Sequence, residues 1–306
     1  MSVAASTALV LALLASQRSV ARGGGIEVVH PEGAAAEAED LARLVPDLRV
    51  EVSDRLGLAL PEEMTVTLVR DREALAAEFG PDIEGWAAGV TFPASRTVAI
   101  RLDAVAPYAA ATLRDVFRHE IVHLAMATLP ARPPRWFEEG VAQWFAGRVI
   151  LGQPADLELA LGLKSLLPFS GLEDRFPSRE DEAALAYLES ESIVSHLVRR
   201  FGPVGLRDVI GQFARLGDLK RAIEAALGIA LVDLEVSWRK DLEERGTLLF
   251  LVFRTVPLFA LVALVVVIGF WRARARRKRT LERFDAEASG EAHGREDPGE
   301  DRLGLF

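Results

Sequence analysis

The sequence predicts an α+β protein with a small mixed sheet that contains a hairpin, a mainly helical part after it, and one C-terminal transmembrane helix. Three observations predict this arrangement. The segments with strand character all lie in the first third of the 306 residues. Segments with helical periodicity dominate after them. Close to the C-terminus, one apolar run is long enough to cross a bilayer.

The strand candidates are short and rich in β-branched residues. Ile26–His30 (IEVVH) comes first, and Met64–Val69 (MTVTLV) alternates in the way that is typical of a half-buried strand. Ala87–Phe92 and Thr97–Leu102 flank the sequence PASR, whose proline favours a turn. These two segments are therefore expected to form a hairpin.

Helical periodicity appears twice between the strands and then continues almost to the C-terminus. Ala34–Leu58 reads as a helix interrupted at Pro46, and Asp71–Phe79 begins with a residue type that caps helices. Leu151–Arg179 is more loosely patterned. The later helix candidates are Tyr108–Leu129, Arg135–Val149, Glu180–Arg200, Gly205–Leu216, Asp218–Leu227 and Leu231–Arg245.

Residues 1–25 resemble a secretory signal peptide with a linker. Ala8–Ala15 is a short apolar run, and Ser19-Val20-Ala21 resembles a small-x-small cleavage site. No Lys or Arg precedes the apolar run, so the alternatives are an uncleaved anchor or a frayed helix. Gly23-Gly24-Gly25 reads as a flexible joint that leads to a domain covering residues 26–245.

The segment Thr247–Trp271 is predicted to span a membrane. Arg254 is its only charged residue, and a helix of this length reaches about 37 Å at about 1.5 Å per residue. The basic collar that follows, RARARRKR at Arg272–Arg279, favours a cytoplasmic location by the positive-inside rule. The alternative, a buried core helix, fits poorly because such helices are rarely this long. We therefore expect the domain to be extracytoplasmic (periplasmic or extracellular). Residues 272–306 would then be cytoplasmic and would form the basic collar and a disordered tail.

Composition excludes several classes of site and partner. The chain has no cysteine, which excludes disulfides, thiolate zinc sites and a cysteine nucleophile. Its net charge of −9 argues against a nucleic-acid partner. The hydrophobic fraction of 50% is sufficient for a sizeable core.

The stretch RHEIVHLA carries two histidines with the spacing of a metal site. His119 and His123 are four residues apart, so on a helix they lie on one face and can aim two imidazole nitrogens at one ion. Glu120 is rotated by about 100° from His119, where it can take a proton from a water that the metal activates. The alternative is a pair of histidines on a polar helix face. The apolar neighbours disfavour it, because buried imidazoles need partners.

A third ligand is expected on the helix that follows. Catalytic zinc sites keep three protein ligands and one open position. Arg135–Val149 offers Glu138 and Glu139, which point in directions about 100° apart. Geometry alone leaves both glutamates open.

RHEIVHLA followed by PRWFEEGVAQWFAG resembles the gluzincin metallopeptidases, in particular their peptidase MA-like domains. In that family the glutamate before the glycine of the second helix is the third ligand, so the resemblance implies Glu139. Glu138 then becomes a variable position that is solvated or lines the rim of the site. Gln143 stands where thermolysin-like members have an aspartate, so no second-shell partner for His119 is implied. The resemblance extends over about residues 68–242, through AYLES, LVRRFG and LEVSW.

The resemblance also implies roles outside the metal motif. Gluzincins commonly place a phenol or imidazole to stabilise the oxyanion, and Tyr187 is the candidate here. The plainer alternative is that Tyr187 packs between helices. The resemblance further implies that Thr97–Leu102 is an edge strand along which a peptide substrate pairs; the plainer alternative is an ordinary sheet strand.

Together these features predict a membrane-anchored zinc peptidase of the HExxH gluzincin type. Zn²⁺ would be held by His119, His123 and Glu139, with Glu120 as general base. Its expected partners are a peptide or protein substrate and the lipid bilayer. The alternative is a catalytically inactive zincin-like domain that serves as an anchored binding or assembly protein.

Overall fold

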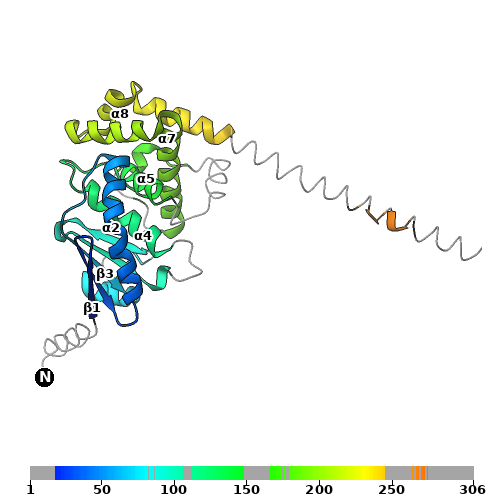
Figure 1. Cartoon of the computed structure of the whole chain (residues 1–306). Helices are drawn as coiled ribbons and strands as arrows, with labels where there is room; N and C mark the ends of the chain where they lie inside the picture. The colour runs from blue at the N-terminus through cyan, green and yellow to red at the C-terminus, as the bar shows by residue number, and fades with distance from the viewer. Residues whose placement is uncertain are drawn as a thin grey trace, which may run out of the picture. The chain divides into compact units, whose positions relative to one another are not determined.

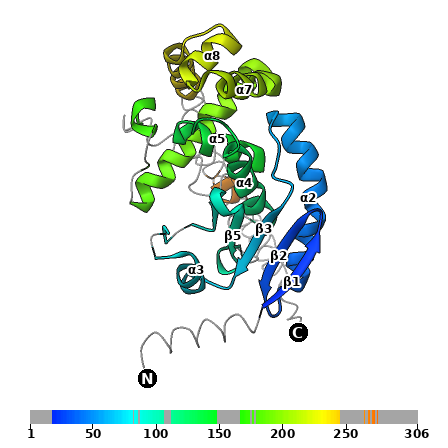
Figure 2. The same ribbon diagram turned by 90° about the vertical axis from the view of Figure 1, so that its left-hand side faces the viewer.

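A computed structural model describes most of the chain before residue 245. The described residues are 18–81, 83–85, 87–105, 112–147, 166–173, 176 and 179–244, together with 264, 267, 268, 270–272 and 274. The chain divides into two compact units, residues 1–243 and 244–306. The first unit is the α+β part, and Figures 1 and 2 show its strands and helices.

A five-stranded mixed sheet forms one half of the first unit, in the order β1-β2-β3-β5-β4. The strands β2, β3 and β5 are parallel neighbours, while β1 and β4 pair antiparallel at the two edges. The strand bounds are Arg18–Gly23 (β1), Ile26–Pro31 (β2), Met64–Val69 (β3), Gly89–Phe92 (β4) and Thr97–Arg101 (β5). The predicted strands and the predicted hairpin are thus present, because their alternating apolar side chains supply both faces of the sheet.

The prediction of a linker at Gly23–Gly25 was wrong. Residues 18–23 form β1, with Gly23 paired to Ile26 across a two-residue turn. Gly24 and Gly25 have φ of +61° and +82°, which are the backbone angles that a tight hairpin turn of this kind requires. The small-x-small sequence Ser19–Ala21 therefore lies inside a paired strand, and cleavage after it would remove most of β1. Residues 1–17 lie outside the described part, so the signal peptide stays a prediction.

Helix α2 (Ala35–Leu56) packs on β1 and β2. It runs through Pro46 without ending, so the predicted interruption there was wrong. The ring of Pro46 lies against the hairpin turn, where a methyl group on Gly24 would come within 3.0 Å of it. Helix α3 (Arg72–Phe79) packs on β3 and β5, and its N-cap Asp71 accepts a hydrogen bond from the amide of Ala74.

Helices α4 and α5 carry the candidate metal motif. Helix α4 (Leu113–Met126) starts at Thr112, which forms a capping box with Asp115, rather than at the predicted Tyr108. Residues 106–111 lie outside the described part. Helix α5 (Arg135–Ala146) ends at Gly147, whose φ of +77° terminates the helix in the left-handed conformation.

The remaining helices form the other end of the unit, away from β1 (Figures 1 and 2). Helix α7 (Glu180–Leu216) contains one non-helical residue, Gly202, which separates the two helices predicted there. Helix α8 (Leu219–Leu227) begins after Asp218, and residues 231–244 are again helical. One apolar core joins α2, α4, α5, α7 and α8 to one face of the sheet. A smaller cluster formed by Val69, Leu75 and Ala99 lies between the sheet and α3.

Most of the predicted membrane segment at residues 247–271 lies outside the described residues. Of the positions from 247 onward, those that are described are helical. Among the described residues, no helix is both long and apolar enough for a bilayer crossing. The predicted basic collar and tail lie mainly outside the described part too.

Candidate metal centre

His119, His123 and Glu139 converge on one point between α4 and α5. The two Nε2 atoms are 3.1 Å apart, and each lies 3.4 Å from Oε2 of Glu139. A tetrahedral zinc ion with bonds of about 2.0–2.1 Å requires ligand atoms roughly 3.3–3.4 Å apart. The three atoms therefore have the mutual spacing of one face of a zinc tetrahedron.

The surroundings of Glu139 also fit a cation. Its Oε2 is buried and has no hydrogen-bond partner among the described residues. An unpartnered carboxylate oxygen costs free energy in an apolar interior, and a metal ion removes that cost. The chain has no cysteine that could supply a thiolate ligand. The two imidazole nitrogens and one carboxylate oxygen are a donor set that is typical of zinc sites without cysteine.

The electrostatics of the cluster favour positive charge. Burial works against a charged His123, but the carboxylates of Glu139 and Glu138 outweigh it and raise the pKa of His123 well above its usual value. Burial alone would raise the pKa of Glu139, yet the imidazoles of His123 and His119 lower it far below its usual range. The cluster therefore favours a positive charge next to the carboxylate of Glu139.

One two-pronged ion pair and one close packing contact fix the helices that carry the cluster. Arg118, directly before His119, makes a two-pronged pair with Glu51 of α2 at 2.6 and 2.7 Å, and this contact lowers the pKa of Glu51. On α5, Gly140 faces the carbonyl oxygen of Ser190 in α7, where a methyl group would collide with it. The glycine after Glu139 is therefore required for α5 and α7 to approach.

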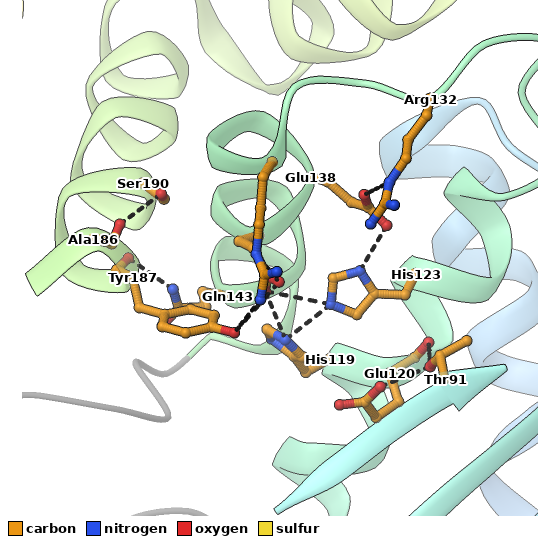
Figure 3. A network of polar contacts seen from close by, with 12 residues as sticks. Thr91, His119, Glu120, His123, Arg132, Glu138, Gln143, Ala186, Tyr187 and Ser190 are labelled. Carbon is orange, nitrogen blue, oxygen red and sulfur yellow. Dashed lines mark hydrogen bonds and ion pairs between the residues drawn. The ribbon is translucent and has the colours of Figure 1, made fainter. Parts of the chain in front are cut away.

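Glu120 lies on the sheet side of the cavity, next to β4. The hydroxyl of Thr91 lies 2.7 Å from Glu120 Oε2 and 3.0 Å from the carbonyl oxygen of the same residue, and Figure 3 shows this contact. Gly89 allows the close approach, since a methyl group there would lie 2.7 Å from Cγ of Glu120. Glu120 and the three residues of the cluster all line one cavity of about 730 Å³.

Tyr187 of α7 reaches the same cavity. Its hydroxyl donates to Oε1 of Glu139 over 3.5 Å and accepts from Nη2 of Arg135 at 3.2 Å. Burial, followed by the Glu139 carboxylate, raises the pKa of Tyr187, so the phenol stays protonated and can donate. Gln143 holds this part of α7, because its amide donates to the carbonyl oxygen of Tyr187 at 2.8 Å (Figure 3).

Of the two positions predicted for Glu138, the structure has the one that lines the cavity and not the solvated one. Its side chain is only 14% exposed, and its Oε1 lies 3.0 Å from Nδ1 of His123. Thr91, which contacts Glu120, and Arg135, which contacts Glu139, were not predicted. The sequence does carry one signal for Thr91: it lies two residues after Gly89, so in a strand both residues face the same side.

The prediction for Thr97–Leu102 also needs correction. The strand β5 is an inner strand, and β4 is the edge strand that lines the cavity.

A sequence model described as the Peptidase MA superfamily matches residues 57–244. The uncharacterized protein YhcO of Bacillus subtilis is 24% identical over 139 residues, which is 44% of this chain and 41% of YhcO.

Solved structures give weaker similarities. Leukotriene A4 hydrolase of Saccharomyces cerevisiae is 15% identical with a TM-score of 0.47, over 69% of this chain and 36% of that one. A mutant M1 zinc metallopeptidase of Deinococcus radiodurans is 17% identical with a TM-score of 0.44, over 72% of this chain and 51% of that one. The chain thus spans only about a third to a half of the length of these proteins.

Proposed function

Because the chain belongs to the peptidase MA superfamily, we propose that it is a zinc-dependent peptidase of the HExxH gluzincin type. His119, His123 and Glu139 hold the metal, and Glu120 is the general base. The observation that carries this proposal is the spacing of the three ligand atoms, 3.1, 3.4 and 3.4 Å, around a carboxylate oxygen with no other partner in the described chain.

Zinc, when bound, supplies a Lewis acid that activates water and polarises the carbonyl group of the scissile peptide. Glu120 takes one proton from the attacking water as the new carbon–oxygen bond forms. It then gives that proton to the nitrogen of the leaving amine as the carbon–nitrogen bond breaks. Thr91 orients Glu120 by its hydrogen bond to Oε2, which leaves Oε1 of Glu120 for the proton transfer.

Tyr187 donates a hydrogen bond to the carbonyl oxygen of the substrate as negative charge develops there. Its present contact with Glu139, at 3.5 Å, is long and readily exchanged for one to the substrate. The substrate backbone pairs with β4, which is an edge strand and lines the cavity through Gly89, Val90 and Thr91.

The substitution Glu120→Gln tests the proposal. It removes the base without removing a metal ligand, so we expect zinc content to stay unchanged and cleavage of a mixed peptide library to fall by about 10²- to 10⁴-fold. Glu191→Gln is the matched control, since Glu191 accepts a hydrogen bond from Ser195 and does not line the cavity. Zinc binding without chelator-sensitive cleavage in the unmodified chain would favour the binding-protein alternative instead.

We also propose that the domain is exported and anchored by residues 247–271, with the basic collar in the cytoplasm. This rests on the sequence alone. Membranes that contain the full chain should retain it during alkaline extraction, and the tail should resist protease added outside sealed cells. Release of the chain by alkali would contradict the anchor.

A further inference from the structure

The two imidazoles of the cluster differ in what their second nitrogen contacts. Nδ1 of His123 lies 3.0 Å from Oε1 of Glu138, and each of these side chains is only 14% exposed (Figure 3). Nδ1 of His119 is buried and has no hydrogen-bond partner among the residues that the structure describes. Among the described residues, only His123 therefore has a carboxylate partner at Nδ1.

The carboxylate partner decides which nitrogen of His123 carries the proton. A neutral imidazole has one N–H group, and an ionised carboxylate only accepts hydrogen bonds. Glu138 therefore keeps the proton on Nδ1 and leaves the lone pair on Nε2. That Nε2 atom is the one that lies 3.4 Å from Glu139 and 3.1 Å from His119. The contact prepares His123 as a metal ligand in both tautomer and orientation.

Glu138 and Glu139 are adjacent on α5 but contact different atoms of His123. Successive residues of a helix differ in direction by about 100°, and Glu138 and Glu139 reach opposite nitrogens of the same imidazole. Arg132 lies 3.6 Å from Oε2 of Glu138, but its side chain is 81% exposed. Such an exposed pair contributes little, so the position of Glu138 depends mainly on His123 and on α5.

We infer that Glu138 is a positioning residue of the metal centre, which holds His123 in the tautomer and orientation that bind zinc. The inference rests on the proposed zinc site.

Zinc affinity tests the inference. It is measured on the full chain by competition with a chromophoric chelator, for Glu138→Ala, Glu138→Gln and the control Glu191→Gln. We expect Glu138→Ala to weaken zinc binding by about 10- to 100-fold. Glu138→Gln should lose less, because the amide oxygen still accepts the proton of Nδ1 but carries no charge. The control should bind as the unmodified chain does.

A second readout separates positioning from general damage to the fold. In the ¹⁵N NMR spectrum of the zinc-loaded chain, His123 should carry its proton on Nδ1, and Glu138→Ala should shift this signal more than Glu138→Gln does. The nearly isosteric Gln variant keeps the test valid if the Ala variant does not fold. If both variants bind zinc within about twofold of the unmodified chain, the inference is overturned while the proposed function stands. A change that small lies well below the loss of zinc affinity expected when such a partner is removed. Absence of zinc binding by the unmodified chain would overturn the proposed function and the inference with it.

Discussion

The two walls of the cavity hold their functional groups by different means. On the sheet side, one neutral hydroxyl group, that of Thr91, contacts the Glu120 carboxylate, and Gly89 lacks the side chain that would displace Glu120. On the helix side, Glu139 lies among two imidazoles, a guanidinium and a phenol. The difference teaches that, in the proposed function, the general base and the metal ligands are held by different neighbours, although Glu120 and His119 share α4. Changes on the two walls should therefore affect separate measurements.

The largest expected effect comes from the helix wall, with Glu139→Ala. Structural zinc sites with four protein ligands have apparent zinc-binding free energies of about 10–16 kcal/mol. If that free energy is divided equally among the ligands, removing one ligand weakens zinc binding by about 100-fold or more. Cleavage should fall with the zinc content, as measured by chelator competition and peptide hydrolysis on the same samples. An intact zinc affinity in this variant would remove Glu139 from the ligand set.

Tyr187→Phe should sharpen the comparison, because Tyr187 belongs to the helix wall without being a proposed ligand. We expect kcat to fall by about 10²-fold while KM and zinc affinity stay nearly constant, since the phenol donates only to charge that develops during the reaction. A loss of zinc affinity as large as that of Glu139→Ala would mean that the two roles are not separable on this wall.

The smallest effect is expected from the sheet wall, with Thr91→Val. The substitution keeps the shape and removes the hydrogen bond to Glu120, so kcat should fall by about tenfold, which corresponds to about 1.4 kcal/mol. In a chain that already carries Glu120→Gln, the same change should cost almost nothing more, because the two residues act as a unit. Full additivity of the two substitutions would show that Thr91 acts independently of Glu120.

Local spacing was sufficient to predict that the imidazoles of His119 and His123 lie next to each other. His119 and His123 are one helical turn apart, and a turn is a property of any helix whatever surrounds it. The alternating residues of β3 and the hairpin of β4 and β5 were predictable for the same reason. Glu139 needed the resemblance to a known family, because adjacent glutamates on a helix cannot be told apart by spacing.

Contacts that depend on tertiary packing could not be predicted. Thr91 and Glu120 are 29 residues apart in the chain, and only the packing of β4 on α4 brings them together. The contact of Glu138 with His123 depends on how α4 and α5 pack against each other. The strand β1 was missed because three consecutive glycines predict a linker and a hairpin turn equally well, and only the pairing of Arg18–Gly23 decides between them.

The most direct test of the metal centre is diffraction at the zinc absorption edge from crystals of the full chain grown with zinc. We predict one anomalous peak, at about 2.0–2.2 Å from Nε2 of His119, Nε2 of His123 and Oε2 of Glu139. A zinc ion bound to other residues, with these three side chains free of metal, would contradict it.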